Sequence, residues 1–217
     1  MTFASREEGG RRLGQYLADR RVQGDLVLGL PRGGVIVAAE VASMLRLPLD
    51  VLVVRKIGHP WYREFAVGAM AENGVVLLDG AAVSANSLVR DELDVVIAEE
   101  AERLRAYQAK FHRAAPIDRR DKTVLIVDDG LATGATTEVA VKAARTQGVR
   151  GVMVAAPVAS LSAVERLGAV ADDVMVLLID PEFDAVGSYY AEFSQTTDEE
   201  VLKLLQANER ATTHQHA

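Results

Sequence analysis

Residues 124–137, VLIVDDGLATGATT, have the form of a buried β-strand that ends in two acids. The first four residues are apolar, as in a strand covered on both faces, and Asp128 and Asp129 follow them directly. A loop of glycine, alanine and threonine then leads into a segment with helical periodicity. In an open parallel sheet, ligands bind beyond the carboxyl ends of the strands, so this stretch predicts a sheet strand with a ligand site at its end.

The rest of the chain repeats this alternation of apolar strands and helices. Strands are predicted at 26–30, 49–54, 122–127, 151–157 and 174–180, with a hairpin at 66–71 and 75–78. Helices are predicted at 5–20, 35–46, 86–112, 136–147, 160–168 and 198–206, and a loop at 56–64. This pattern predicts one α/β domain over residues 1–217, in which a mostly parallel sheet has helices on both faces.

Three segments add to this regular pattern. Residues 86–115 and 180–207 are candidates for a hood over the site or for an interface between copies of the chain. Residues 208–217 are polar and are expected to form a flexible tail.

Composition restricts the function classes. The chain has 217 residues, a net charge of −7 and no cysteine. An acidic chain is a poor candidate for broad nucleic-acid binding, and the lack of cysteine excludes disulfides, thiolate metal sites and thiol catalysis. No apolar run has the length of a membrane span or the form of a signal peptide, so we expect a cytoplasmic protein without membrane or nucleic-acid partners.

The loop after the two acids has the features of a phosphate site. Backbone N–H groups at a helix N-terminus point outward without partners, and small residues let a phosphate approach them. The adjacent carboxylates cannot serve that phosphate, because like charges repel, but they are good acceptors for a vicinal diol. The stretch therefore predicts a ligand such as a ribose 5-phosphate. A purely structural role, in which the acids end a strand and Thr136 begins a helix, is the weaker interpretation.

The same stretch resembles the PRPP-binding motif of the type I phosphoribosyltransferases, where PRPP is 5-phosphoribosyl 1-diphosphate. That motif has four apolar residues, two acids and a T-G-x-T-type phosphate loop. The resemblance implies that Asp128 and Asp129 hold the ribose hydroxyls. It also implies that the 5′-phosphate is bound by Ala132, Thr133, Gly134, Ala135 and Thr136, with Thr137 as a further hydroxyl donor. Ala135 stands where many members carry glycine, and we expect this small residue to change the loop little.

A second motif would hold the pyrophosphate of PRPP. LPRGG, residues 30–34, ends a predicted strand and opens a predicted helix, and the family's pyrophosphate loop lies in this place and often contains R-G-G. Pyrophosphate is therefore predicted to bind to Pro31, Arg32, Gly33 and Gly34. Taken alone, the motif is equally typical of a tight turn with a surface arginine.

The third motif, VVRKIGHPWYREF at 53–65, resembles the segment that leads into the family's flexible catalytic loop. The resemblance implies that Arg55 and Lys56 neutralise charge on the departing pyrophosphate and that residues 56–65 close as a lid. The alternative is a solvated loop, and His59 is expected to be structural. Together, the three motifs resemble a group of bacterial phosphoribosyltransferase-like proteins of unassigned acceptor.

In that family, a nitrogen nucleophile displaces pyrophosphate from C1 of PRPP through an oxocarbenium-like transition state. The protein fixes the ribose, neutralises the leaving group and excludes water. The implied cofactor is Mg²⁺, bound through the phosphates of PRPP, with Asp128 and Asp129 in contact with it only through water and with no direct protein ligand. The long charged helix predicted at 86–112 is expected to pack or to form a homodimer.

The acceptor is expected to be a nucleobase, as in nucleotide salvage. Phe183, Tyr189 and Tyr190 are candidates to stack on a planar base. Their segment loosely resembles the purine-binding segment of hypoxanthine phosphoribosyltransferases, although the offset from Phe183 to Val186 differs. A role in the core or in an interface fits these aromatic residues at least as well.

Two other functions remain open. A protein of the same fold that senses PRPP or a nucleotide without turnover would carry the same phosphate loop. Arg55 and Lys56 favour an enzyme, because a sensor has less need to stabilise a leaving group. An unrelated α/β nucleotide-binding protein is the weakest alternative, since neither G-x-G-x-x-G nor G-x-x-x-x-G-K-[ST] occurs.

Overall fold

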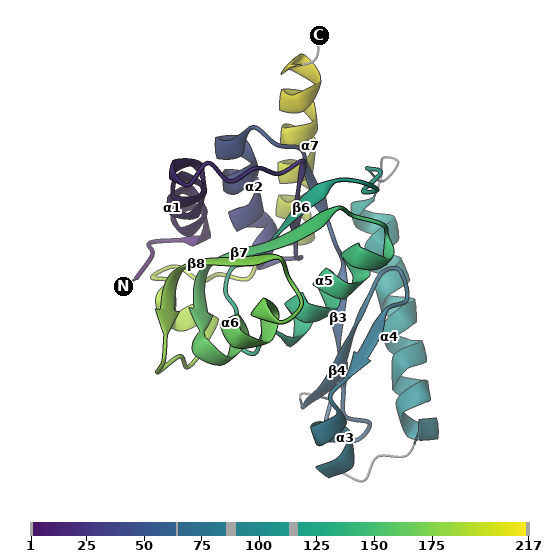
Figure 1. The fold of residues 1–217 in the computed structure, drawn as a ribbon. Helices are drawn as coiled ribbons and strands as arrows, with labels where there is room; N and C mark the ends of the chain where they lie inside the picture. The colour runs from purple at the N-terminus through teal and green to yellow at the C-terminus, as the bar shows by residue number, and fades with distance from the viewer. Residues whose placement is uncertain (1, 64, 86–89, 113–116, 216–217) are drawn as a thin grey trace.

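The structure is a computed structural model that describes residues 2–63, 65–85, 90–112 and 117–215. Five strands form the central sheet in the order β2-β1-β6-β7-β8, and every neighbouring pair is parallel (Figure 1). The strands are β1 (Leu26–Gly29), β2 (Leu49–Val51), β6 (Thr123–Val127), β7 (Gly151–Ser160) and β8 (Asp173–Asp180). The predicted α/β class with a parallel sheet is confirmed.

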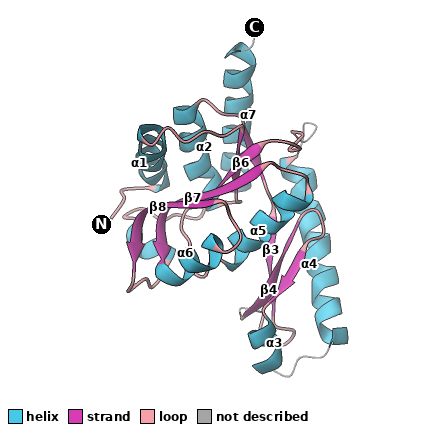
Figure 2. Ribbon diagram, viewed as in Figure 1, coloured by secondary structure: helices cyan, strands magenta, loops and turns pink. Residues whose placement is uncertain are grey.

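Helices cover both faces of this sheet (Figure 2). One face carries α1 (Arg6–Asp19) and α2 (Gly33–Leu45), and the other carries α5 (Ala135–Thr146) and α6 (Leu161–Gly168). Side chains alternate along each strand, so Val27 and Leu125 pack against α1 and α2, whereas Leu28 and Ile126 pack against α5 and α6. Burial on both faces explains why the strands are uniformly apolar.

The connections of the sheet reverse between β1 and β6. After β1 the chain passes through α2 to β2 on one side, and after β6 it passes through α5 to β7 on the other side. Such a switch point separates the loops at the carboxyl ends of the two strands and leaves a crevice for a ligand. Asp128 and Asp129 directly follow β6, so the fold places them at this crevice.

An arm extends from the sheet and is formed by β3 (Val54–Gly58), β4 (Ala66–Ala71), β5 (Val76–Leu78), α3 (Gly80–Ala85) and α4 (Arg90–Phe111) (Figure 1). Its strands are antiparallel, and the predicted hairpin is confirmed. The strand predicted at 49–54 is wrong, because β2 ends at Val51 and residue 54 begins β3 in a different sheet. Residues 56–58, predicted as part of a loop, belong to β3 because they pair with β4. Residues 86–89, where the long helix was predicted to begin, lie outside the described residues.

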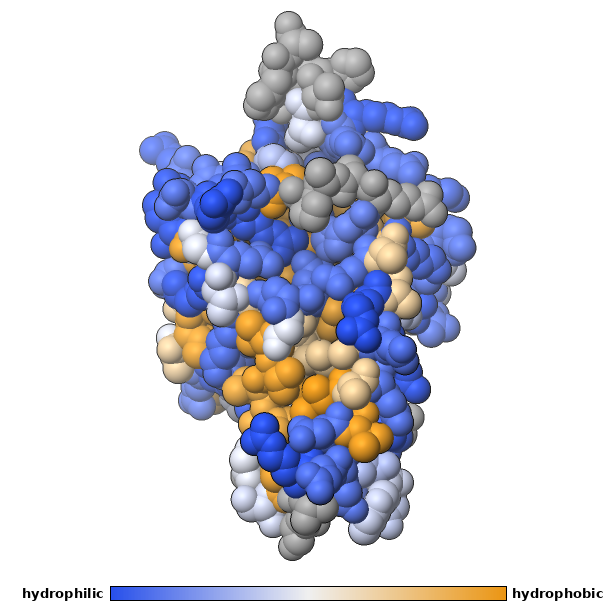
Figure 3. All heavy atoms as spheres, turned by 90° about the vertical axis from the view of Figure 1, so that its right-hand side faces the viewer, coloured by the Kyte–Doolittle hydropathy of each residue, from blue (hydrophilic) through white to orange (hydrophobic). Residues whose placement is uncertain are grey.

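The arm packs on the rest of the protein through small side chains. Ala69 and Ala71 of β4 contact Val139 and Ala143 of α5, so the hairpin runs along that helix. Figure 3 shows hydrophobic side chains gathered on the lower part of one face, where the arm lies. A groove of about 470 Å³ in the arm is lined mostly by apolar residues, which are Val76, Leu78, Val83, Leu93 and Ile97, together with the charged residues Arg90 and Asp94.

The last helix, α7 (Asp198–Gln215), packs beside α2 and the edge strand β2. It is longer than predicted, because Leu205 packs on the core and Asn208 accepts a hydrogen bond from the Leu49 N–H at 2.8 Å. Residues 208–215 are therefore helical where an irregular tail was expected. Within the described residues, no helix is both long enough and apolar enough to cross a membrane.

Candidate functional site

The two acids lie close together at the carboxyl end of β6. Both are partly buried, and the Asp129 N–H donates to Oδ1 of Asp128 at 2.9 Å. Burial raises the pKa of Asp128 well above its usual range, the charge of Asp129 raises it further, and the charge of Lys56 opposes the shift. A ligand that donates hydroxyl protons here would relieve this crowding of negative charge.

The loop after the acids is open toward a ligand. Gly134 has a φ of 70°, a left-handed conformation that suits glycine, and it caps the N-terminus of α5. Among the described residues, the N–H groups of Thr133, Gly134 and Thr136 have no hydrogen-bond partner. This is the arrangement predicted for the 5′-phosphate. The prediction that Thr137 is a further hydroxyl donor to the phosphate is wrong, because Thr137 is only 2% exposed and lies in the core.

Side chains from a later part of the chain donate hydrogen bonds to the carbonyl groups of the same loop. The Ser160 hydroxyl donates to the Ala132 carbonyl at 2.5 Å, and Nη1 of Arg166 donates to the Thr133 carbonyl at 3.2 Å. Arg166 is itself paired with Glu138 at 2.9 Å. These contacts orient the loop so that its N–H groups stay free. The motif does not predict them, because Ser160 and Arg166 lie in a later part of the chain.

The predicted pyrophosphate loop meets the acids directly. Gly33 and Gly34 open α2, and a Cβ atom placed on Gly33 would lie 2.1 Å from Oδ2 of Asp129. A Cβ on Gly34 would lie 2.8 Å from Oδ1 of Asp128. The Arg32 guanidinium points instead toward α7, with Nη1 3.7 Å from Oδ1 of Asp198. The glycines therefore lie against the acids, while the Arg32 side chain is directed toward Asp198.

Gly33→Ala is expected to weaken PRPP binding about tenfold or more, because the added methyl group displaces the Asp129 carboxylate. Calorimetric titration with PRPP measures this. Gly168→Ala is the matched control, since a Cβ there meets nothing within 4 Å. Equal affinity in wild type and Gly33→Ala would mean that this loop does not approach the ligand.

Arg55 and Lys56 lie on opposite faces of β3, as neighbours in a strand must. Nε of Arg55 donates to Oε2 of Glu100 on α4 at 2.6 Å, so the charge of Arg55 is neutralised by an ion pair within the arm. Lys56 is exposed, has no ion-pair partner among the described residues and acts on the pKa of Asp128. The charge of Lys56 thus acts on the acids, whereas Arg55 is engaged with Glu100, and the predicted role of Arg55 at the leaving group loses its geometric support.

The loop at the tip of the arm is organised by His59. Its buried ring accepts hydrogen bonds through Nδ1 from the N–H groups of Trp61 and Tyr62, at 3.1 and 3.3 Å. The Trp61 and Tyr62 side chains are 73% and 69% exposed. His59 therefore has the structural role that was expected, and closure of the loop as a lid stays a prediction.

The aromatic residues proposed for the acceptor are mostly packed in the protein. Tyr189 and Tyr190 are buried, and their hydroxyls donate to Oδ2 of Asp180 at 2.7 Å and to the Asp129 carbonyl at 2.6 Å. Phe183 stacks on Tyr189 with ring centroids 5.2 Å apart. The structure therefore supports the alternative role in the core for both tyrosines. Their burial contradicts the prediction that they stack on a base.

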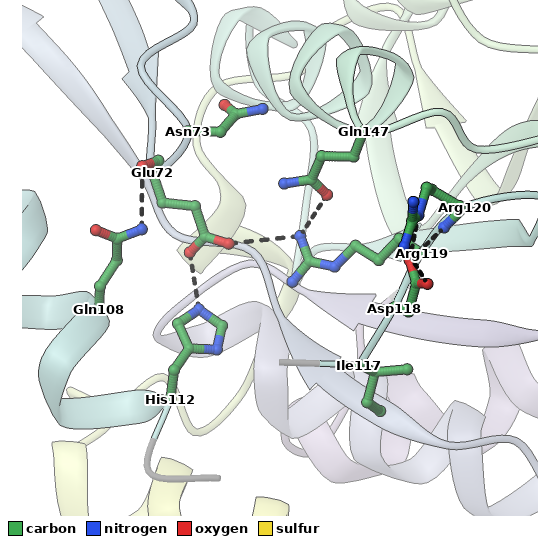
Figure 4. Close-up of a pocket in the computed structure, with 9 residues that line it drawn as sticks. All are labelled: Glu72, Asn73, Gln108, His112, Ile117, Asp118, Arg119, Arg120 and Gln147. Atoms are coloured by element: carbon green, nitrogen blue, oxygen red, sulfur yellow. Dashed lines mark hydrogen bonds and ion pairs between the residues drawn. The ribbon is translucent and has the colours of Figure 1, made fainter. Parts of the chain in front are cut away.

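A second polar pocket, of about 600 Å³, lies at the base of the arm (Figure 4). One of its residues, Gln147, follows the last turn of α5, roughly 18 Å along the helix from the phosphate loop. Buried Arg119 donates to Glu72 at 3.4 Å, to Gln147 at 3.0 Å and to Asp50 at 3.0 Å. His112 lies 2.9 Å from Glu72 and completes a cluster that joins the arm to β2 and β6.

Stability should depend on pH through His112. Its hydrogen bond to Glu72 raises the pKa of His112 above the ordinary value of 6.5, with support from Asp50, while burial and Arg119 oppose the shift. A raised pKa in the folded state stabilises the fold fully below about pH 6.5, and this contribution is lost as the pH rises through the folded-state pKa.

Urea unfolding between pH 5.5 and 9 is therefore expected to show that the free energy of unfolding of the wild type falls as the pH rises. The fall should be smaller in His112→Gln. Parallel profiles for wild type and variant would contradict this assignment.

The chain is similar to known proteins in sequence and in fold. The family model described as "Phosphoribosyl transferase domain" matches residues 8–189. Two Mycobacterium tuberculosis proteins, MT0597 of strain CDC 1551 and Rv0571c of strain H37Rv, carry names that provisionally assign them as phosphoribosyl transferases. Each is 42% identical over 204 residues. The match covers 94% of this chain and 46% of theirs, so the chain spans about half the length of these curated relatives.

Solved structures show the same fold. The crystal structure of TT1426 from Thermus thermophilus superposes with a TM-score of 0.79 at 41% identity, over 95% of this chain and 99% of that one. A purine phosphoribosyltransferase from Pyrococcus horikoshii gives a TM-score of 0.50 at 18% identity, over 90% and 97% of the two chains. At that identity the second likeness concerns the fold alone.

Proposed function

The chain belongs to the phosphoribosyl transferase family, and we propose that it transfers the phosphoribosyl group of PRPP to a nitrogen acceptor and releases pyrophosphate. One observation carries this proposal. The glycines that open α2 lie against the two acids after β6, and the open phosphate loop follows those acids. Pyrophosphate, ribose and 5′-phosphate sites are then adjacent and in the order in which PRPP carries these groups.

In the proposed reaction, Asp128 and Asp129 accept hydrogen bonds from the ribose hydroxyls and stabilise positive charge that develops on the ribose ring. The N–H groups of Thr133, Gly134 and Thr136 hold the 5′-phosphate, and those of Gly33 and Gly34 hold the diphosphate. As the bond from C1 to the diphosphate breaks, the electron pair leaves with pyrophosphate, and the acceptor nitrogen forms the new bond to C1 and gives up its proton to water. Lys56 neutralises the leaving group.

Mg²⁺ is part of the proposal as an ion carried by the substrate. The described residues contain no group of three or more His, Cys, Asp or Glu side chains that would hold a metal ion. Two adjacent carboxylates suit a hydrated Mg²⁺ that is also bound by phosphate oxygens. When bound, this ion would supply further neutralisation of the pyrophosphate charge.

Product analysis tests the proposal. The protein is incubated with PRPP, Mg²⁺ and a panel of purine and pyrimidine bases, and ribonucleoside 5′-monophosphates are measured by mass spectrometry. We expect one class of base to be converted, and a nucleobase is the proposed acceptor. A protein that binds PRPP but forms no product with any acceptor would fit the alternative function, a sensor of PRPP or nucleotides.

We also propose that the chain forms a homodimer and acts in the cytoplasm. The apolar groove of the arm supports the first point, because a surface of this kind is typical of an interface. Analytical ultracentrifugation of wild type and Leu78→Asp tests it. A wild-type monomer at micromolar concentration would contradict the dimer.

A further inference from the structure

Arg6 reaches the site from the far end of the chain. It is the first residue of α1, where a solvated side chain is usual, yet it is only 8% exposed. Its Nε donates to Oδ2 of Asp129 at 2.7 Å, and its Nη1 donates to the Ser194 carbonyl at 2.8 Å. The guanidinium carbon lies 3.8 Å from the centre of the Phe193 ring. One side chain thus joins the acid to the segment after η1 (Val186–Tyr189).

The contact lies where the pyrophosphate and ribose sites meet. A Cβ atom placed on Gly33 would be 2.7 Å from Nε of Arg6 as well as 2.1 Å from Oδ2 of Asp129. Arg6 uses only Oδ2 of the acid, and Oδ1 remains available for a ligand hydroxyl. Nη2 of Arg6 has no hydrogen-bond partner among the described residues.

The segment 186–194 holds Asp129 from a second side. The Tyr190 hydroxyl donates to the Asp129 carbonyl, and burial raises the pKa of Tyr190, so the hydroxyl keeps its proton. Val186 packs on the next residue, because a Cβ placed on Gly130 would lie 2.6 Å from its side chain. The carboxylate of Asp129 is therefore tied to this segment through Arg6, and its backbone is tied through Tyr190.

We propose that Arg6 is a positioning residue, which fixes the Asp129 carboxylate for the ribose hydroxyl and locks the segment 186–194 over the acids. The proposal rests on the proposed function. A carboxylate beside a second carboxylate is repelled and would turn away unless a cation holds it. Only an arginine donates in two directions while it stacks on an aromatic ring, so lysine does not replace it. Fixing the acid before the substrate arrives lowers the entropic cost of binding.

A double-mutant cycle tests this role. PRPP binding is measured by calorimetry for wild type, Arg6→Met, Asp129→Asn and the double variant. We expect Arg6→Met to weaken binding about 10- to 100-fold, and to add less than about threefold in the Asp129→Asn background. Arg6→Lys should not restore affinity. Unchanged affinity in Arg6→Met, or effects that add in full, would overturn the proposal, because addition would mean that Arg6 acts independently of Asp129.

Arg11→Met is the matched control, since Arg11 is an exposed arginine of the same helix. Amide hydrogen exchange supplies a readout that needs no substrate. Exchange in residues 186–194 should be faster in Arg6→Met than in Arg11→Met, and equal exchange would overturn the locking role. If the wild type does not bind PRPP, the proposed function fails, and the exchange comparison still decides whether Arg6 holds this segment.

Discussion

The double substitution Asp128→Asn and Asp129→Asn is expected to weaken PRPP binding on the order of 100-fold or more, while the chain stays folded. Each acid contributes a hydrogen bond from a charged group, worth about 1.5–3 kcal/mol, so the loss of both exceeds about 3 kcal/mol. The fold should tolerate the change, because the asparagines keep the shape of the acids and an amide oxygen at position 129 can still accept the hydrogen bond from Nε of Arg6. Burial and the charge of Asp129 raise the pKa of Asp128, so the charged form of this acid is already disfavoured in the free protein.

Calorimetric titration with PRPP measures this effect, and circular dichroism checks the fold. Asp118→Asn is the matched control, since that acid is exposed and, in the part of the chain that the structure describes, pairs only with Arg120. An unchanged dissociation constant in the double variant would remove the acids from the ribose site. Circular dichroism would reveal a double variant that no longer folds. PRPP affinity would then be compared between wild type and each single variant.

The second large effect is expected for Lys56→Ala, which should lower kcat about 100- to 1,000-fold and change PRPP affinity only a few-fold. Lys56 is exposed on β3 and its charge lowers the pKa of Asp128, and in the proposed reaction this charge matters most when negative charge develops on departing pyrophosphate. Steady-state kinetics combined with PRPP titration separate the two quantities. Lys203→Ala, at an exposed position of α7, is the control.

An unaltered kcat in Lys56→Ala would exclude this lysine from the mechanism. Arg55→Met makes an instructive contrast, because Arg55 is paired with Glu100 within the arm. Its substitution should act mainly on the stability of the arm, and a loss of kcat equal to that of Lys56→Ala would restore it as a leaving-group cation.

The fold and the main loops follow from local features of the sequence. A strand that ends in two acids, and a glycine-rich turn that begins a helix, are set by neighbouring residues, so the sequence indicated that Gly33 and Gly34 open α2, which lies against the acids, and that Gly134 precedes α5. Their meeting point follows from the parallel sheet, because the carboxyl ends of β1 and β6 share one edge.

The remaining features depend on contacts between distant segments. The alternation of β3 puts Arg55 and Lys56 on opposite faces, but only the docking of α4 decides that Arg55 is the residue paired with Glu100. The Arg6–Asp129 pair joins residues 123 positions apart, and no sequence motif predicts this contact. The burial of Tyr189 and Tyr190 likewise depends on packing with Phe3 and Val158, which sequence patterns do not show.

Release of inorganic pyrophosphate from PRPP tests the central claim most directly. The assay uses Mg²⁺, a protein-free extract of small metabolites as the source of acceptor, a control without acceptor, and the double variant Asp128→Asn and Asp129→Asn. The predicted result is release that requires the acceptor and is lost in the double variant, since both acids hold the reacting ribose. Release at the same rate in wild type and double variant would contradict a reaction at these acids, and no release from any mixture would contradict a transferase.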